Sequence, residues 1–413
     1  MHIWWIPLII PFYIFDFRKE HYNLKNKISS PIFAERINHI ITICLFCLIL
    51  GGISIGSILK KDSHFSETEN RILKQKPELS LENIKSGKYE KEYEEYLSDQ
   101  FLFRNQWIAC KTKIDRLLLK QEVNGVYFSK NDYYIEKHEK EEFQNKISQK
   151  NITYMKQFIT QYQDILGKEN IQVLIVPTAS YILKEKLPAF ALEDGQKEFL
   201  EEIKKEIPEE NYISVEEILL EHKTEDIYYR TDHHWTTLGA YYGYLAWAEQ
   251  RNITAWIEDK FHKKIVSDNF LGTIQSKVNI KMPPDNIILY EPLSPISYEM
   301  RINLEETIQN SIYDLEKLKT KDQYAVFLGG NSALTEIKSD NRNGKKLLLI
   351  KDSFANSISP FMINHFEETY LLDFRYFNGS LEQFITENGI TEICILYSTV
   401  NLGNDRYFSK LLR

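Results

Sequence analysis

Apolar positions along the chain follow two periodicities, and together they predict an α/β protein. Continuous apolar runs predict buried strands at residues 171–176, 346–350, 369–373 and 393–397. Apolar residues at helical spacing predict helices at residues 89–119, 141–166, 199–207, 237–249, 355–365 and 381–388. Because strands alternate with helices in the C-terminal half, we expect a doubly wound parallel sheet with helices on both faces.

Other stretches predict smaller elements. Residues 126–128 and 133–135 flank a polar tetrapeptide, which is typical of a β-hairpin. Residues 325–328 read as a strand that ends at a Gly-Gly-Asn turn. The region from about 261 to 310 is less regular and is broken by Met282-Pro283-Pro284-Asp285, so we expect an insertion there.

One apolar segment is long enough to cross a membrane. Residues 40–59 carry no charge, and a helix of this length spans about 30 Å. We therefore expect a cytoplasmic or interfacial segment at 1–36, a transmembrane anchor at 37–60 and one extracytoplasmic domain at 61–413. Residues 3–15 are apolar but too short to span a bilayer, so we expect them either to lie at the membrane interface or to result from an early start codon. Whether the anchor is cleaved stays open.

Composition limits the classes of ligand that we expect the protein to bind. The net charge of −8 argues against nucleic acid. Four cysteines are too few for a disulfide scaffold, and no Cys-x-x-Cys pair lies beside histidines in a soluble segment, so we predict neither a structural zinc site nor another cofactor.

Two distant stretches carry candidate chemistry. In Asp232-His233-His234-Trp235, the Asp-x-His spacing lets Asp232 orient His234 as a general base. Ser353 follows an apolar strand and precedes a helix, which is where nucleophilic serines tend to lie. The alternatives are a helix-capping role for Ser353, a surface turn at Asp232, and metal binding by the Asp-His-His cluster. Adjacent histidines on a strand point to opposite faces, which disfavours the metal.

Several motifs together resemble the DHHW protein family, which is related to alginate O-acetyltransferases and more widely to SGNH hydrolases. The resemblance runs from about residue 67 to the C-terminus. It rests on Asp232-His233-His234-Trp235, Thr68-Glu69-Asn70-Arg71 with Leu73, Asp99-Gln100-Phe101 with Arg104, Phe327-Leu328-Gly329-Gly330-Asn331, and Lys351-Asp352-Ser353-Phe354-Ala355-Asn356. Lys351 stands where the SGNH serine block has glycine. The resemblance implies an SGNH-like fold and a triad of Ser353, His234 and Asp232.

The same resemblance implies a membrane-anchored, serine-dependent O-acetyltransferase or acetylesterase that acts on a cell-surface polysaccharide through an acyl-serine. Its expected partners are an acetyl donor, the polysaccharide acceptor and a multispanning O-acyltransferase. The Ser353 backbone N–H is the first expected oxyanion donor, and further candidates follow neighbouring strands: Asn331, Arg375, Tyr376 and Asn401. The alternatives are a non-catalytic glycan-binding or scaffold subunit, which the many aromatic residues favour, and a plain hydrolase or lipase, although Ser353 lacks a Gly-x-Ser-x-Gly elbow.

Overall fold

The computed structural model describes residues 31–66, 71–294 and 296–413, and these fall into two compact units. The first unit reaches Ile108, and the second runs from Ala109 to Arg413. The interfacial segment expected at residues 3–15 and the motif residues 68–70 lie outside the described residues.

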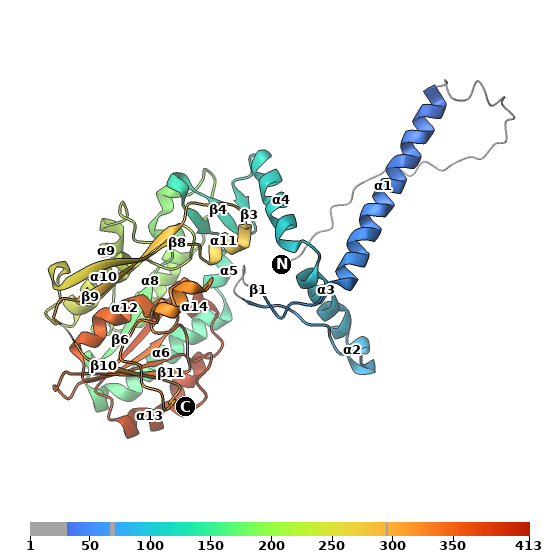
Figure 1. Cartoon of the computed structure of the whole chain (residues 1–413). Coiled ribbons are helices and arrows are strands. Elements are labelled where there is room, and N and C mark those ends of the chain that lie inside the picture. Colours follow the sequence, from blue (N-terminus) through green and yellow to red (C-terminus); the bar gives the residue numbers. More distant parts are fainter. Residues whose placement is uncertain (1–30, 67–70, 295) are drawn as a thin grey trace, which may run out of the picture. The chain divides into compact units, whose positions relative to one another are not determined.

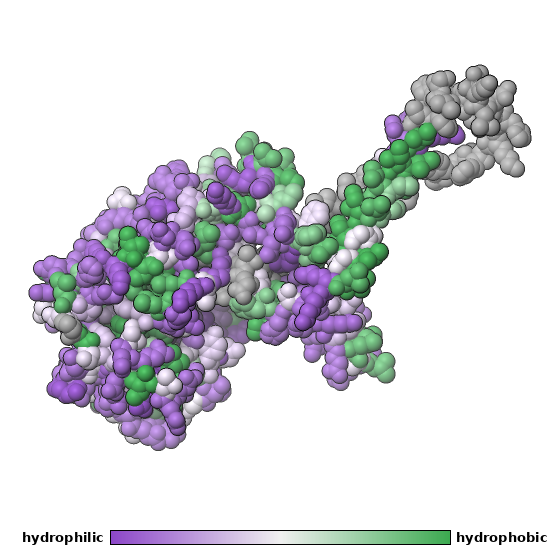
Figure 2. Space-filling view, viewed as in Figure 1, coloured by the Kyte–Doolittle hydropathy of each residue, from purple (hydrophilic) through white to green (hydrophobic). Residues whose placement is uncertain are grey.

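The first unit begins with helix α1 (Pro31–Leu59), and residues 35–59 of this helix are long and apolar enough to cross a membrane. The visible face of α1 is almost wholly hydrophobic in Figure 2. None of its apolar window is buried in the protein, so the helix is not a core helix. This finding is consistent with the expected single-pass anchor.

The rest of this unit consists of a short two-stranded antiparallel sheet followed by helices. Strand β1 (Phe65–Ser66) pairs with β2 (Arg71–Ile72), and α2 (Leu81–Lys85) and α3 (Lys88–Gln100) follow. The side chain of Gln100 donates to the carbonyls of Ser63 and Lys74, and Asp99 accepts from the Lys74 N–H. The Asp99-Gln100 motif therefore fixes local backbone structure. The helix expected over 89–119 is wrong as a single element, because it is interrupted between α3 and α4 (Arg104–Leu117).

The second unit contains a seven-stranded sheet in the order β10-β11-β13-β12-β14-β6-β7. Strands β6, β10 and β11 of this sheet are labelled in Figure 1. Five neighbouring strands run parallel: β6 (Ile171–Val176), β7 (Tyr212–Ile213), β12 (Lys346–Lys351), β13 (Glu368–Leu372) and β14 (Glu392–Ser398). At one edge, β11 (Leu334–Ser339) and β10 (Tyr298–Ile302) are antiparallel. The expected wholly parallel sheet is therefore corrected to a mixed one.

Alternate residues of the strands enter two separate cores, as the two-residue period of a strand requires. In β12, Leu347 and Leu349 join the core that contains α10 and α12, whereas Leu348 and Ile350 join the core that contains α6 and α8. The helices of the second unit are α5 (Lys140–Phe143), α6 (Lys146–Leu166), α7 (Ala179–Ile182), α8 (Gln196–Glu206), α9 (Glu216–Glu221), α10 (Thr237–Gln250), α11 (Thr273–Val278), α12 (Ala355–Met362), α13 (Leu381–Asn388) and α14 (Thr399–Asn404).

The smaller elements are partly as expected. The hairpin appears as β4 (Val126–Phe128) paired with β5 (Tyr134–Glu136), and β3 (Glu122–Val123) extends it. The helix expected over 141–166 is instead divided into two helices, α5 and α6. The strand expected at 325–328 is wrong, since residues 323–326 form a 3₁₀ turn. The region 261–310 is more regular than expected, because β8 (Phe261–Phe270) pairs with β9 (Asp285–Pro292), and β10 belongs to the main sheet.

Candidate active site

The histidine motif lies in a tight loop between Tyr228 and Trp235, which form an isolated antiparallel bridge. Asp285 of β9 holds the loop, because its carboxylate accepts the backbone N–H groups of Arg230 and Thr231 at 3.0 and 2.8 Å. The Thr231 hydroxyl donates to the same carboxylate. The expected insertion therefore supplies part of the support for the site.

Trp235 anchors the other end of the loop in the core. Its ring is fully buried, and its indole N–H donates to the Phe354 carbonyl at 2.9 Å. Two glycines of α10 make room for it, because a Cβ on Gly243 would lie 2.8 Å from the Trp235 ring and one on Gly239 would lie 3.1 Å from the Trp235 Cβ. The tryptophan thus ties the histidine loop to the residue that follows Ser353.

A continuous chain of hydrogen bonds joins the three residues that the sequence singles out. Asp232 Oδ1 lies 2.6 Å from His234 Nδ1, and His234 Nε2 lies 2.8 Å from Ser353 Oγ. Because a carboxylate only accepts, the neutral imidazole carries its proton on Nδ1, and Nε2 is free to accept the Ser353 proton. All three side chains are buried or nearly so, with Ser353 9% exposed.

The Asp232 carboxylate is held by more donors than His234 alone. Its Oδ2 accepts the backbone N–H and the hydroxyl of Thr273 at 2.8 and 3.0 Å, and Oδ1 also accepts the His234 backbone N–H. Burial by itself would raise the pKa of Asp232, but His233, His234 and the Thr273 N–H outweigh it and hold the pKa far below its usual value. Asp232 is therefore ionised across the physiological range.

Tyr324 packs against the imidazole of His234. Its ring stacks on His234 with centroids 3.9 Å apart and an angle of 10° between the planes. The Tyr324 hydroxyl lies 3.1 Å from both the Ser353 carbonyl and Ser357 Oγ. The ring thus fixes the plane of the imidazole while its hydroxyl reaches the backbone of the serine turn.

Asp352 holds the serine turn against the neighbouring strand. Its Oδ1 accepts the Phe354 N–H, and its Oδ2 accepts from the Ser398 N–H, the Ser398 hydroxyl and Asn401 Nδ2 at 2.7–2.8 Å. Ser398 and Asn401 lie at the carboxyl end of β14. At the Asp-Ser pair, the aspartate therefore positions the backbone of the turn, and the serine hydroxyl contacts the histidine.

Lys351, which stands where the SGNH serine block has glycine, is 2% exposed. Its ammonium donates to Asn331 Oδ1 at 2.9 Å and to Asn356 Oδ1 at 2.6 Å. Burial lowers the pKa of Lys351 to about 8. The lysine side chain thus links the Gly-Gly-Asn turn to the helix that follows Ser353.

The four further candidates are not gathered at one point. Asn331 contacts Lys351, whereas Arg375 and Asn401 line a cavity of about 270 Å³ together with Asp352. Arg375 uses Nε and Nη2 to bind the Asp373 carboxylate, which raises its pKa further although burial opposes this. Tyr376 is 52% exposed.

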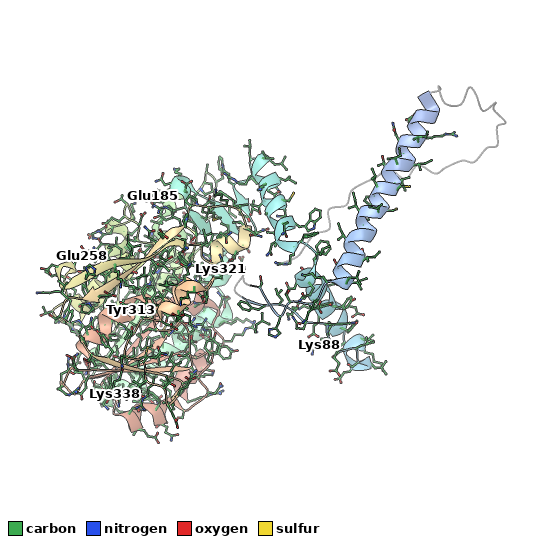
Figure 3. All side chains as sticks on the ribbon, viewed as in Figure 1. Lys88, Glu185, Glu258, Tyr313, Lys321 and Lys338 are labelled. Atoms are coloured by element: carbon green, nitrogen blue, oxygen red, sulfur yellow. The ribbon has the colours of Figure 1, made fainter. Side chains whose placement is uncertain are left out.

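Several supporting residues have no clear signal in the sequence. Thr273, Tyr324 and Asp285 each contact the histidine loop, but they lie between 39 and 90 residues away from His234 along the chain. Asp285 appears in the sequence only as part of a Pro-Pro-Asp break. Lys321, labelled in Figure 3, donates to the Leu271 carbonyl and to Gln275, so it steadies the segment that carries Thr273.

The cluster of Asp232, His233 and His234 has ligand atoms within 4.8 Å of one another. The two imidazole rings lie with centroids 3.9 Å apart, so the expectation that they point to opposite faces is wrong. Both nitrogens of His234 are nevertheless engaged with Asp232 and Ser353, and His233 Nδ1 lies 2.7 Å from the Thr273 hydroxyl. A metal ion would have to displace these hydrogen bonds.

Comparisons with known proteins agree on the fold. The family model described as "DHHW protein" matches residues 122–372. A crystal structure of a DHHW family protein from Eubacterium siraeum is 24% identical, covers 70% of this chain and 96% of its own, and has a TM-score of 0.56. The structure of Bacillus cereus PatB1 is 22% identical over 67% of this chain and 97% of its own, with a TM-score of 0.56.

A second PatB1 structure, described as carrying a sulfonyl adduct, is 20% identical over 68% of this chain and 99% of its own, with a TM-score of 0.54. No curated protein sequence matches the chain.

Proposed function

The chain belongs to the DHHW family, and from this premise we propose that it is a serine-dependent O-acyltransferase or acetylesterase with Ser353 as nucleophile, His234 as general base and Asp232 as the residue that orients His234. One observation carries the proposal: the unbroken hydrogen-bond chain from Asp232 through His234 to Ser353. A serine hydroxyl is too weakly acidic to attack an ester at neutral pH without such a base. A capping role for Ser353 would not need the imidazole contact.

In the first half-reaction, the Ser353 hydroxyl gives its proton to His234 Nε2 while Oγ bonds to the acyl carbon of the donor. The bond from that carbon to the donor oxygen breaks, and the leaving oxygen takes the proton from Nε2. The products are an acyl-serine, a free alcohol and neutral His234. Asp232 stabilises the imidazolium that forms between these two proton transfers.

In the second half-reaction, a sugar hydroxyl or water gives its proton to Nε2 while its oxygen bonds to the acyl carbon. Ser353 Oγ then leaves and recovers the proton. Transfer to a sugar gives an O-acetylated polysaccharide, and transfer to water gives acetate. The family resemblance favours an acetyl group and a polysaccharide.

Negative charge on the acyl oxygen needs a donor in both half-reactions. We assign this role first to the Ser353 backbone N–H, which donates to none of the described residues. Asn401, Arg375, Asn331 and Tyr376 remain further candidates in this proposal. Asn401 and Arg375 have the better support, because both line a cavity with Asp352 next to the nucleophile.

We also propose that α1 anchors the protein as a single-pass membrane helix with the catalytic unit outside the cytoplasm. The support is the exposed apolar window at residues 35–59. A multispanning O-acyltransferase that delivers acetyl groups across the membrane is the partner that fits this topology.

The enzymatic proposal is tested by the rate at which the wild type and Ser353→Ala hydrolyse 4-nitrophenyl acetate. The control is Ser86→Ala, because Ser86 is exposed and lies far from Ser353 along the chain. We expect Ser353→Ala to lose turnover and Ser86→Ala to keep it. Equal rates in wild type and Ser353→Ala would reject the serine mechanism. No turnover in any of the three proteins would favour a glycan-binding subunit instead.

A further inference from the structure

A second cavity, of about 280 Å³, opens beside the histidine loop at the carboxyl edge of the parallel strands. It is lined by the loops after β6 and β14, by Phe354, by β5 and by α11. His233 and Phe354 in its wall are the chain neighbours of His234 and Ser353. The cavity is therefore next to the proposed reaction centre, and its volume suits one small unit of a substrate rather than a long segment.

His233, which lines this cavity, carries a hydrogen-bond acceptor. The Thr273 hydroxyl donates its single proton to Asp232, so the 2.7 Å contact between Thr273 Oγ1 and His233 Nδ1 requires the proton to be on the histidine. Burial and the neighbouring His234 lower the pKa of His233, which keeps the ring neutral. Its Nε2 then carries a lone pair, and none of the described residues donates to it.

His138, which also lines the cavity, has the same hydrogen-bonding arrangement as His233. Its ring is 8% exposed, and Nδ1 lies 3.1 Å from the Glu142 carboxylate, which can only accept. In the neutral ring, Nε2 is again an acceptor, and it too has no partner among the described residues. Two imidazoles from distant segments thus line one cavity, and the Nε2 atom of each has no partner among the described residues.

The charged groups in the wall disfavour an anionic ligand. Lys277 is the one lysine or arginine among the described residues that line the cavity, and it is paired with Glu136. Burial alone would raise the pKa of Glu136, but the paired ammonium of Lys277 opposes it and the pKa is lowered, so the carboxylate stays ionised. A carboxylate or phosphate on the ligand would meet Glu136 and two acceptor nitrogens with no free cation to pair it.

We propose that this cavity binds the acyl acceptor, and that the acceptor is a single sugar unit without negative charge, whose hydroxyls donate to Nε2 of His233 and His138. The inference rests on the proposed acyl transfer. Sugar hydroxyls can donate to both imidazole nitrogens, and the partly exposed side chain of Val400 offers an apolar surface for the carbon face of the ring. The subsite distinguishes neutral glycans from polyuronates and phosphate-bearing polymers.

The first test measures how the acyl group partitions between water and an added sugar. With 4-nitrophenyl acetate as donor, we expect methyl glucoside to be acetylated at least about tenfold better than methyl glucuronide. Equal or better transfer to the glucuronide would overturn the neutral-sugar assignment. Glu136→Gln should narrow the difference, because it frees Lys277 to pair with the glucuronide carboxylate.

The second test removes one acceptor nitrogen at a time. In His138→Asn and His233→Asn, the side-chain amide can make the hydrogen bond of the imidazole Nδ1, but no atom replaces Nε2. We therefore expect the ratio of sugar transfer to hydrolysis to fall about tenfold in each variant. The matched control is His262→Asn at an exposed histidine of β8, which should keep the wild-type ratio. Unchanged ratios in both cavity variants would overturn the proposal. If either fails to fold, Val400→Phe fills the same cavity and should give the same loss.

A binding measurement separates this inference from the catalytic one. Saturation-transfer NMR with methyl glucoside on Ser353→Ala should show binding that disappears when His138→Asn is added. Binding without any acyl-enzyme in the wild type would reject the proposed enzyme and retain the sugar site. An acyl-enzyme without sugar binding would reject the site alone.

Discussion

Gly272 and Asp232 are so close that a Cβ on Gly272 would lie 2.3 Å from both the Cβ and Oδ2 of Asp232. Such a contact cannot be accommodated without moving the carboxylate or the loop. We therefore expect Gly272→Ala to lower kcat for acetyl-ester hydrolysis by roughly 10–100-fold, as displacement of a catalytic group by about 1 Å does elsewhere.

The control for that change is Gly52→Ala, since nothing lies within 4 Å of a Cβ at Gly52. It should keep the wild-type rate. A Gly272→Ala enzyme with the wild-type kcat would show that the position of Asp232 is not critical.

Thr273→Val should weaken the orientation of the base without removing any member of the triad. Valine keeps the shape and the backbone N–H, but it loses the hydroxyl that donates to Asp232 and accepts from His233. We expect kcat for the acetyl ester to fall by about tenfold, which corresponds to about 1.4 kcal/mol of transition-state stabilisation. Thr153→Val, at an exposed position of α6, is the matched control. An unaffected kcat in Thr273→Val would contradict this role.

Lys351 should make the free energy of unfolding depend on pH. Its pKa is about 8 in the folded protein and 10.5 in its ordinary state, so between these values the unfolded chain binds more protons than the folded one. The free energy of unfolding should therefore gain up to about 1.4 kcal/mol per pH unit from this group as the pH rises through that window. Below pH 8 the penalty for burying the charge is present in full.

Lys351→Met isolates this contribution from the other groups that titrate in the same range. Denaturant unfolding of both proteins between pH 7 and 10.5 should give a steeper rise for the wild type. Parallel curves would mean that the lysine is not depressed in the folded state.

Chelation tests the metal alternative at the Asp-His-His cluster. Because both nitrogens of His234 are used by Asp232 and Ser353, we expect EDTA and 1,10-phenanthroline to leave the acetyl-ester rate unchanged. A loss of rate that added zinc restores would instead assign these residues to a metal centre.

The sequence predicts the strands with long apolar runs well, and β6 matches its expected range of residues 171–176 throughout. The edge strands β10 and β11 are missed because they are partly exposed and lack such runs. Broken helices are missed for another reason: Phe101 and Gln144 leave helical geometry at positions where neither proline nor glycine marks the break.

The same division holds at the site. Asp232, His234 and Ser353 are found from spacing and from the family motifs, whereas Thr273 and Tyr324 contact them only through tertiary packing. The expectation that adjacent histidines diverge fails because the loop is not an extended strand, so the alternation of a strand does not apply to it. His138 is likewise brought to the cavity by the fold alone.

The proposed mechanism requires that Ser353 becomes acylated. The most direct measurement is peptide mapping by mass spectrometry after brief exposure of the wild type and His234→Ala to an activated acetyl ester and, separately, to a sulfonyl fluoride. We expect one adduct, on Ser353, that forms in the wild type and is lost or strongly slowed in His234→Ala. An adduct on another residue, or none with either reagent, would contradict it.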